Sequence, residues 1–440
     1  MEWQYVILFM FVSLIVLMLT GLPIAFCFFA VNIFAGYIFF GGMIGLERFY
    51  GSMYSTLISF IFLPIPLFIL MGEVLFYSGL APILIKTLDK WMGRMPGRLS
   101  LLAVGAGTLF STLTGTSIAS VAMLGSALVP EMEQRGYKKP MTMGPIMGSG
   151  NLAMFIPPSG LAVLCGALAH ASIGRLLIAI ILPGLLLAAL MAAYIIIRCL
   201  IQPDLAPSYE VSRTSFSVKV REFIKYILPQ SIVIFLVIGV IFLGIAGPGE
   251  AAATGAMGVI VLALCYKKLS WQAFMNAVMG TVKVTGMLFL VIASARFFSE
   301  VMAFSGATAG MAAIVKDIQL SPMMIIIIMQ LIVLFLGCFM DPPSIMMITI
   351  PIFIPIVKFL GFDLIWFCVL LLINIEIAMI TPPFGVSLFV MKGVATKDTT
   401  MVDVYKAGFP FVLLSLLAMA LIMIFPKLVM WLPGIMMRFR

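Results

Sequence analysis

Charged side chains are scarce in this sequence. Only 10% of its 440 residues are Asp, Glu, Lys or Arg, whereas 63% are hydrophobic, and the mean hydropathy is +1.23. This composition excludes a soluble globular domain. A membrane-spanning helix needs about 20 apolar residues, and suitable runs lie near residues 5–40, 57–78, 176–200, 228–266, 284–305 and 407–426. We therefore expect an all-α polytopic membrane protein.

Cysteine and histidine are also scarce. The six cysteines occur singly without a CxxC motif, so we expect neither disulfides nor a metal centre. The single histidine, His170, and the absence of HExxH and serine-nucleophile motifs disfavour an enzyme, although an intramembrane enzyme remains an alternative. We expect His170 to be interfacial, the alternative being a proton relay. We expect no cofactor, and no nucleic-acid partner despite a net charge of +9, because the basic residues lie between apolar segments.

Two pairs of adjacent prolines interrupt long apolar runs. NLAMFIPPSG spans residues 151–160, and EIAMITPPFG spans residues 376–385. Proline lacks a backbone donor and clashes with the carbonyl one turn back, so each pair is expected to break a helix. A simple kink is the alternative for one such pair. Interrupted helices at matching places in two halves are typical of the substrate and ion site of a transporter.

The similarity of the two halves extends beyond the prolines. Pro382 follows Pro157 by 225 residues, and Gly361 follows Gly136 by the same 225. GEVLFYSG at 72–79 corresponds to SEVMAFSG at 299–306, an offset of 227. A nearly constant offset along the chain indicates an internal repeat.

Each half also contains a short polar tip between two apolar arms that are too short to span a membrane. The tips are TGTSIAS at 114–120 and MDPPS at 340–344. This pattern predicts re-entrant helical hairpins, which require protein or water around the tip. Basic residues flank the first hairpin heavily and the second sparsely, so the positive-inside rule places their bases on opposite sides of the membrane.

The expected organisation is therefore two inverted repeats. The boundaries are: first repeat 1–200, with scaffold helices 1–85 and a hairpin with a broken helix at 99–170; cytoplasmic connection 201–227; second repeat 228–440, with scaffold helices 228–305 and a hairpin with a broken helix at 322–393. The N-terminal MEWQYVILFM lacks a basic segment before its apolar run, so we expect it to begin the first helix and not a cleaved signal.

Polar groups at the tips and breaks are candidate ligands. Unwound carbonyls and hydroxyls suit Na⁺, and helix N-termini suit a carboxylate; close helix packing is the alternative use of such small residues. Asp341 can either coordinate an ion or cap the helix that begins at Pro342. Glu300 has Arg296 four residues earlier and Glu73 as its repeat counterpart, so an internal ion pair and a substrate role are both open.

At these motifs the chain resembles the large membrane subunit of tripartite ATP-independent periplasmic (TRAP) transporters. NIEIAMITPPFGVSLFV at 374–390, TGTSIASVAMLGSALVPEMEQRGY at 114–137 and FIPPSG at 155–160 carry the resemblance, which covers essentially the whole chain. It implies a multi-pass protein of the bacterial inner membrane that works by an elevator mechanism with Na⁺ as coupling ion. Its partners would be a small four-helix membrane subunit, here as a separate chain, and a periplasmic substrate-binding protein that delivers an organic acid of the sialic acid or C4-dicarboxylate class.

The resemblance also implies roles for individual residues. The first Na⁺ site would comprise Thr114, Gly115, Ser117, Gly150 and Asn151; the second would comprise Met340, Asp341, Ser344, Thr381 and Pro382; the substrate would contact Thr116, Pro157, Pro158, Ser159, Glu376 and Pro383. Ser120 stands where some members would carry an acid, so no ion role is assigned to it. A stand-alone Na⁺/dicarboxylate symporter of related architecture is the alternative function.

Overall fold

The computed structural model describes residues 2–93, 95–114, 117–207, 215–317, 320–383, 385–396 and 398–436. The regular secondary structure of these residues consists entirely of helices. The helices of the first half are α1 Trp3–Leu19, α2 Ile24–Phe39, α3 Met43–Leu57, α4 Pro64–Tyr77, α5 Ala81–Trp91, α6 Arg98–Thr114, α7 Ser117–Gln134, α8 Lys139–Asn151, α9 Gly160–Leu168, α10 Ile173–Ala179 and α11 Ile181–Ile201. Those of the second half are α12 Phe216–Glu222, α13 Leu228–Phe242, α14 Pro248–Cys265, α15 Trp271–Phe304, α16 Ala307–Asp317, α17 Pro322–Gly337, α18 Pro342–Phe359, α19 Leu364–Met379, α20 Val386–Val394, α21 Met401–Ile424 and α22 Lys427–Met436.

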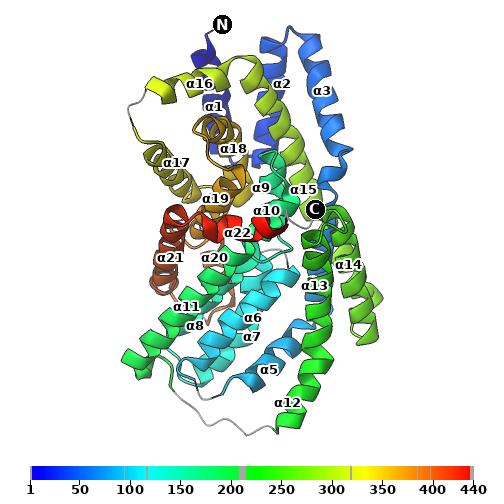
Figure 1. The fold of residues 1–440 in the computed structure, drawn as a ribbon, viewed down its shortest axis with the longest axis vertical. Helices are drawn as coiled ribbons and strands as arrows, with labels where there is room; N and C mark the ends of the chain where they lie inside the picture. The colour runs from blue at the N-terminus through cyan, green and yellow to red at the C-terminus, as the bar shows by residue number, and fades with distance from the viewer. Residues whose placement is uncertain are drawn as a thin grey trace.

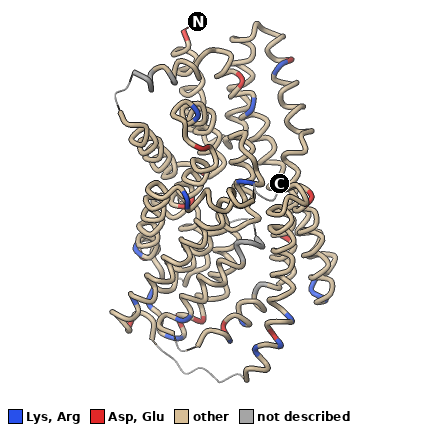
Figure 2. The backbone as a smooth tube through the Cα atoms, in the orientation of Figure 1, with Lys and Arg blue, Asp and Glu red and all other residues tan. Residues whose placement is uncertain are grey.

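Seven helical segments of the described chain are long and apolar enough to cross a membrane, and further apolar helices are shorter. The expected all-α polytopic class is therefore confirmed. Lys and Arg gather at the lower end of the molecule in Figure 2, which the positive-inside rule assigns to the cytoplasm. The connection predicted at 201–227 is helical from Phe216 onward, because α12 continues through a π-helical turn into α13.

The helix starts repeat with the offset seen in the sequence. From α5 to α16 the start moves by 226 residues, from α7 to α18 by 225, and from α8 to α19 by 225. The hairpin α6–α7 lies in the lower half of Figure 1, whereas α17 and α18 lie in the upper half, so the two hairpins occupy opposite halves of the molecule. Both predicted helical pairs, α6–α7 and α17–α18, are present.

One difference separates the halves. In the first, α3 and α4 are separate helices joined by a 3-10 turn at Phe60–Phe62, whereas the second half has a single helix of 34 residues, α15. Pro64 and Pro66 lie in the first turn of α4, where proline is tolerated, but they would break a helix that continued from α3 through these positions. The corresponding positions of α15 hold no proline. Local sequence thus breaks one helix and leaves its counterpart continuous.

The interrupted helices α8 and α19 occupy the centre of the fold. Every residue from Met141 to Asn151 and from Ile365 to Met379 is buried. One face of α8 receives a helix from the far end of the chain: Cβ atoms at Gly144 and Gly148 would each lie 2.5 Å from the ring of Phe411 on α21. Glycine at these positions allows the close approach.

Candidate functional site

The tips of the two hairpins face one cavity. Ser117, the first residue of α7, and Asp341, which precedes α18, both line a cavity of about 420 Å³. The opposite wall is apolar and comes from α2, α4 and α15, including Ile24, Ile69 and Met287. The fold therefore brings polar groups from both repeats to one place between the hairpins and the remaining helices.

The first tip and the end of α8 each contain a polar atom that no described residue satisfies. The buried hydroxyl of Ser117 and the buried amide nitrogen of Asn151 have no hydrogen-bond partner among the described residues. Asn151 Oδ1 accepts a hydrogen bond of 2.8 Å from the hydroxyl of Ser387 on α20. The two ends of an amide are assigned from its hydrogen bonds. Exchanging them would let Asn151 donate to Ser387 and turn the carbonyl oxygen, a Na⁺ ligand, to the free side.

The remaining predicted ligands of the first Na⁺ site are Gly150, Thr114 and Gly115. Gly150 packs directly on α7, because a Cβ atom there would lie 2.5 Å from Val121 Cγ2. Thr114 ends α6, and Gly115 and the predicted substrate contact Thr116 lie outside the described residues.

At the second tip, the carboxylate of Asp341 is exposed and accepts a hydrogen bond from the hydroxyl of Ser344. No amide of the first turn of α18 donates to this carboxylate, so helix capping does not account for it. The Thr381 hydroxyl donates to the Ile377 carbonyl at 2.6 Å, which leaves its oxygen able to accept or to coordinate. Met340 is half-buried next to Asp341, and Pro382 is exposed.

Both predicted helix breaks are present. In the first half, α8 ends at Asn151 and α9 begins at Gly160; in the second, α19 ends at Met379 and α20 begins at Val386. The Pro157–Pro158 and Pro382–Pro383 bonds are both cis. Ser159 is buried and caps α9 by accepting a 3.2 Å hydrogen bond from the Ala162 amide.

The predicted substrate contacts that the structure describes do not line the cavity. Pro157, Pro158 and Ser159 are buried beside it, and Pro383 is exposed away from its lining. Glu376 is fully buried next to Ser415 of α21, and neither its carboxylate oxygens nor the Ser415 hydroxyl forms a regular hydrogen bond with a described residue. The cavity is lined instead by their neighbours and by scaffold residues, which sequence reasoning missed: Pro23, Ile24, Ala25, Ile69, Gly160, Leu161, Val284, Met287, Leu288, Val291, Met379 and Val386.

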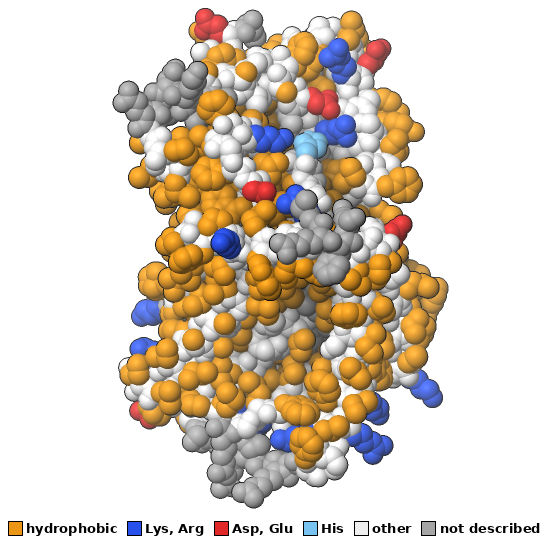
Figure 3. Space-filling view, viewed as in Figure 1, with side chains coloured by type: hydrophobic (Ala, Val, Ile, Leu, Met, Phe, Trp, Pro, Cys, Tyr) orange, Lys and Arg blue, Asp and Glu red, His pale blue; other side chains and the backbone are white. Residues whose placement is uncertain are grey.

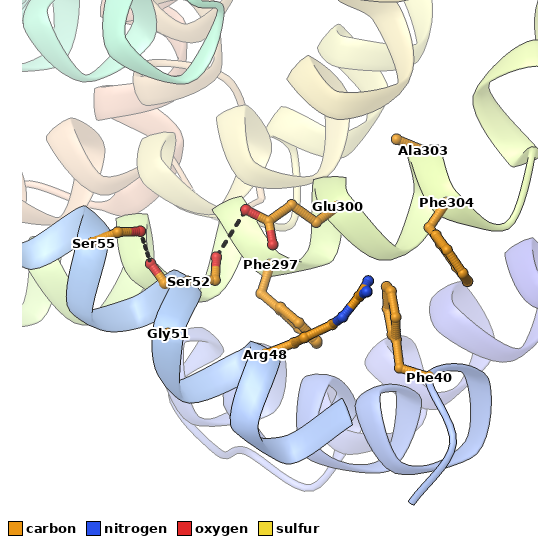
Figure 4. Close-up of a pocket in the computed structure, with 9 residues that line it drawn as sticks. All are labelled: Phe40, Arg48, Gly51, Ser52, Ser55, Phe297, Glu300, Ala303 and Phe304. Atoms are coloured by element: carbon orange, nitrogen blue, oxygen red, sulfur yellow. Dashed lines mark hydrogen bonds between the residues drawn. The ribbon is translucent and has the colours of Figure 1, made fainter. Parts of the chain in front are cut away.

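The two glutamates of the repeated GEV and SEV segments have different environments. Glu300 forms an ion pair with Arg296 at 3.4 Å and accepts a 3.0 Å hydrogen bond from Ser52. It lines a separate groove between α2, α3 and α15, where the Arg48 guanidinium lies 5.1 Å from the centre of the Phe40 ring (Figure 4). Glu300 thus forms the expected pair with Arg296 within α15, whereas Glu73 forms no ion pair with a described residue.

The histidine lies at the surface. Figure 3 shows it in the upper half of the molecule with basic side chains on either side. His170 follows α9 in a left-handed conformation, with φ of 51°, and does not line the cavity between the hairpin tips. Its exposed position agrees with an interfacial residue.

The sequence matches one protein family over residues 11–428: "Tripartite ATP-independent periplasmic transporter, DctM component". It is 30% identical to the C4-dicarboxylate TRAP transporter large permease protein DctM of Pseudomonas aeruginosa, over 87% of this chain and 88% of that protein. It is 29% identical to the sialic acid TRAP transporter permease protein SiaT of Haemophilus influenzae, over 87% of this chain and 61% of that protein.

The fold is also similar to solved transporters. The Neisseria gonorrhoeae MtrF structure superposes with a TM-score of 0.64 at 15% identity, covering 87% of this chain and 84% of MtrF. The Alcanivorax borkumensis YdaH transporter gives a TM-score of 0.62 at 15% identity, covering 86% and 88%. At such low identity this similarity concerns the architecture alone.

Proposed function

Since the chain belongs to the DctM family of TRAP transporter large membrane subunits, we propose that it imports an organic acid together with Na⁺. The acid would be of the sialic acid or C4-dicarboxylate class and would be delivered by a periplasmic binding protein. A small four-helix membrane subunit would complete the complex. The protein is a multi-pass transporter subunit of the bacterial inner membrane and not an enzyme.

The observation that carries this proposal is the meeting of both hairpin tips at one cavity. Ser117 and Asp341 come from opposite repeats, and the buried hydroxyl of Ser117, which lines the cavity, has no partner among the described residues. Buried polar groups normally have partners, so free ones beside a cavity support a site for Na⁺. We assign the two Na⁺ sites to the residues expected at the two tips, with Asn151 and Asp341 as the side chains of greatest interest.

In the proposed elevator mechanism, the hairpins and broken helices move together against the other helices. The burial of α8 and α19 supports a moving unit that contains these helices and their packing partners; this unit would include α21 as well as the hairpins, because Phe411 of α21 packs on the glycine face of α8. The apolar wall from α2, α4 and α15 would let the polar tips slide past without forming competing hydrogen bonds.

Uptake in liposomes tests the function. With the small subunit, the binding protein and an inward Na⁺ gradient, the chain should accumulate radiolabelled succinate or N-acetylneuraminate. Equal uptake by this chain alone would favour the alternative, a stand-alone symporter. Uptake that ignores the Na⁺ gradient would refute the assignment of Na⁺ as the coupling ion.

A substitution separates the second Na⁺ site from general stability. Asp341→Ala should reduce Na⁺-driven uptake far more than the amount of protein in the membrane, because it removes the only carboxylate that lines the described part of the cavity. Asp398→Ala, which removes a 76% exposed carboxylate that does not line the cavity and pairs with Lys139 at 3.7 Å, is the matched control. Unchanged Na⁺ dependence in Asp341→Ala would count against this site.

Labelling tests the first tip. Na⁺ should protect a Ser117→Cys variant from a thiol reagent, because the ion would occupy the space beside that side chain. Ile118→Cys is the control, since Ile118 lines the same cavity but is apolar and 48% exposed. Equal labelling of Ser117→Cys with and without Na⁺ would mean that this tip only packs.

A further inference from the structure

A lysine is exposed in the interior of the long scaffold helix α15. Lys283 lies 12 residues after Trp271, where α15 begins just beyond the basic pair Lys267 and Lys268. At 1.5 Å per residue this is a rise of about 18 Å. Because the hydrocarbon core is about 30 Å thick, Lys283 lies near the middle of the membrane.

An ammonium group at this depth requires water, an anion or a polar partner. Charged residues within membrane-spanning helices almost always face a protein interior or a water-filled route, and they mark substrate and ion pathways. Lys283 forms no ion pair with any residue that the structure describes. Its partner is therefore outside the described protein groups.

The neighbours of Lys283 connect it to the cavity. Met287, one helical turn away, is 50% exposed and lines the cavity between the hairpin tips. Residues four apart share a face of a helix, so Lys283 continues this lining toward the cytoplasmic end. On α4, Glu73 likewise stands one turn beyond the cavity residue Ile69.

Glu73 and Lys283 belong to adjoining turns of the two scaffold helices. The Glu73 carboxylate packs on α15 at Gly280, where a Cβ atom would lie 2.7 Å from Oε2, and Lys283 is three residues further along that helix. The half-buried carboxylate has no ion pair in the described structure, and the two opposite charges are more than 4.0 Å apart. A gap between an unpaired cation and an unpaired anion is suited to water or to a small anion.

We propose that Lys283 binds the carboxylate of the transported acid on the cytoplasmic side of the cavity, and that Glu73 competes for the same ammonium group when the acid has left. This assignment rests on the proposed function, because that function supplies a substrate with a negatively charged carboxylate. It adds a contact on the scaffold, beyond the sites at the hairpin tips, and it lies on the route by which the acid would reach the cytoplasm. The two residues make opposite contributions: Lys283 attracts the anion, and Glu73 promotes its release.

Cysteine accessibility tests whether Lys283 faces water. In a background with the exposed Cys265 replaced by Ser, Lys283→Cys and Val282→Cys are compared in inverted membrane vesicles that contain the complete complex. A charged thiol reagent should label Lys283→Cys and leave Val282→Cys, a 59% exposed apolar neighbour on another face, unlabelled. Equal reactivity at the two positions would overturn the proposal, because Lys283 would then face the same surroundings as Val282.

Substrate effects test the binding step. Millimolar succinate or N-acetylneuraminate, whichever wild type transports, should slow labelling of Lys283→Cys. Lys283→Met should raise the KM for transport about tenfold, the loss expected for one charge-assisted hydrogen bond, and Lys283→Arg should retain most of the affinity. Glu73→Gln should lower the KM. Normal KM in Lys283→Met, or labelling that the transported acid does not slow, would refute this site, whereas absence of transport by wild type would refute the proposed function.

Discussion

Close packing between the first broken helix and the first hairpin makes Gly150 a sensitive position. An added Cβ atom would lie 2.5 Å from Val121 Cγ2 and 3.0 Å from the Val121 backbone nitrogen. The methyl group can rotate away, but the backbone nitrogen moves only if α7 moves. Ser117, at the start of α7, is one turn from Val121, so Gly150→Ala should displace the first tip as well as strain the core.

Two free-energy changes should follow from Gly150→Ala. Overpacking of a core costs about 1–3 kcal/mol, and Na⁺ bound at a concentration of 100 Kd stabilises the folded protein by about 2.7 kcal/mol. The variant should therefore be less stable in the absence of Na⁺ and should lose most of the additional stability that Na⁺ gives to wild type. Gly105→Ala is the matched control, because an added Cβ atom there meets no atom within 4 Å.

Thermal unfolding of the purified complex, measured with and without Na⁺ at constant ionic strength with choline, would check this prediction. Gly105→Ala should be as stable as wild type or more so, by up to about 1 kcal/mol from helix propensity, and should keep its response to Na⁺. If Gly150→Ala showed the wild-type increase in melting temperature with Na⁺, the proposed link between this contact and the first Na⁺ site would be wrong.

Three further substitutions have definite expected outcomes. Ser387→Ala removes the 2.8 Å hydrogen bond to Asn151 and should raise the Na⁺ concentration for half-maximal uptake about fivefold, from a loss of about 1 kcal/mol; Ser126→Ala, whose hydroxyl bonds only to its own helix, should leave it unchanged. Glu376→Met should raise the free energy of unfolding by about 1–3 kcal/mol, because it replaces a fully buried carboxyl group, whose one polar neighbour is Ser415, by an apolar chain of similar size; destabilisation in chemical unfolding would contradict this. Asp89→Asn should cost about 2 kcal/mol, since it weakens the 2.8 Å ion pair of Arg98, a side chain only 5% exposed; a melting temperature equal to wild type would show that this pair contributes nothing.

Much of the architecture could be predicted from local chemistry. Tandem prolines in the interior of a helix must interrupt it, so Pro157 and Pro382 located both breaks, and short apolar arms around polar tips identified both hairpins. The constant offset then related each element to its counterpart. The breaks and the hairpins depend on residues close in sequence, so they can be predicted from the sequence alone.

Features that depend on helix rotation were not predictable in the same way. Glu376 lies in the same motif as the second break, but its side chain points to Ser415 of α21 and not to the cavity. The lining by Met287 and Ile69 depends on how α15 and α4 are turned relative to the hairpins, and nothing in their apolar sequences distinguishes one face from another. Periodic patterns mark a face only where polar and apolar residues alternate along a helix.

The packing of Phe411 against Gly144 and Gly148 has a consequence for biosynthesis. Residues 139–151 form the buried helix α8, yet part of their cover is α21, which begins at Met401. During translation about 250 residues are therefore added after α8 before its glycine face can be covered, and at roughly 5–20 residues per second this takes more than ten seconds. The first half cannot reach its final packing as an autonomous unit, because a membrane segment of the second half completes its core.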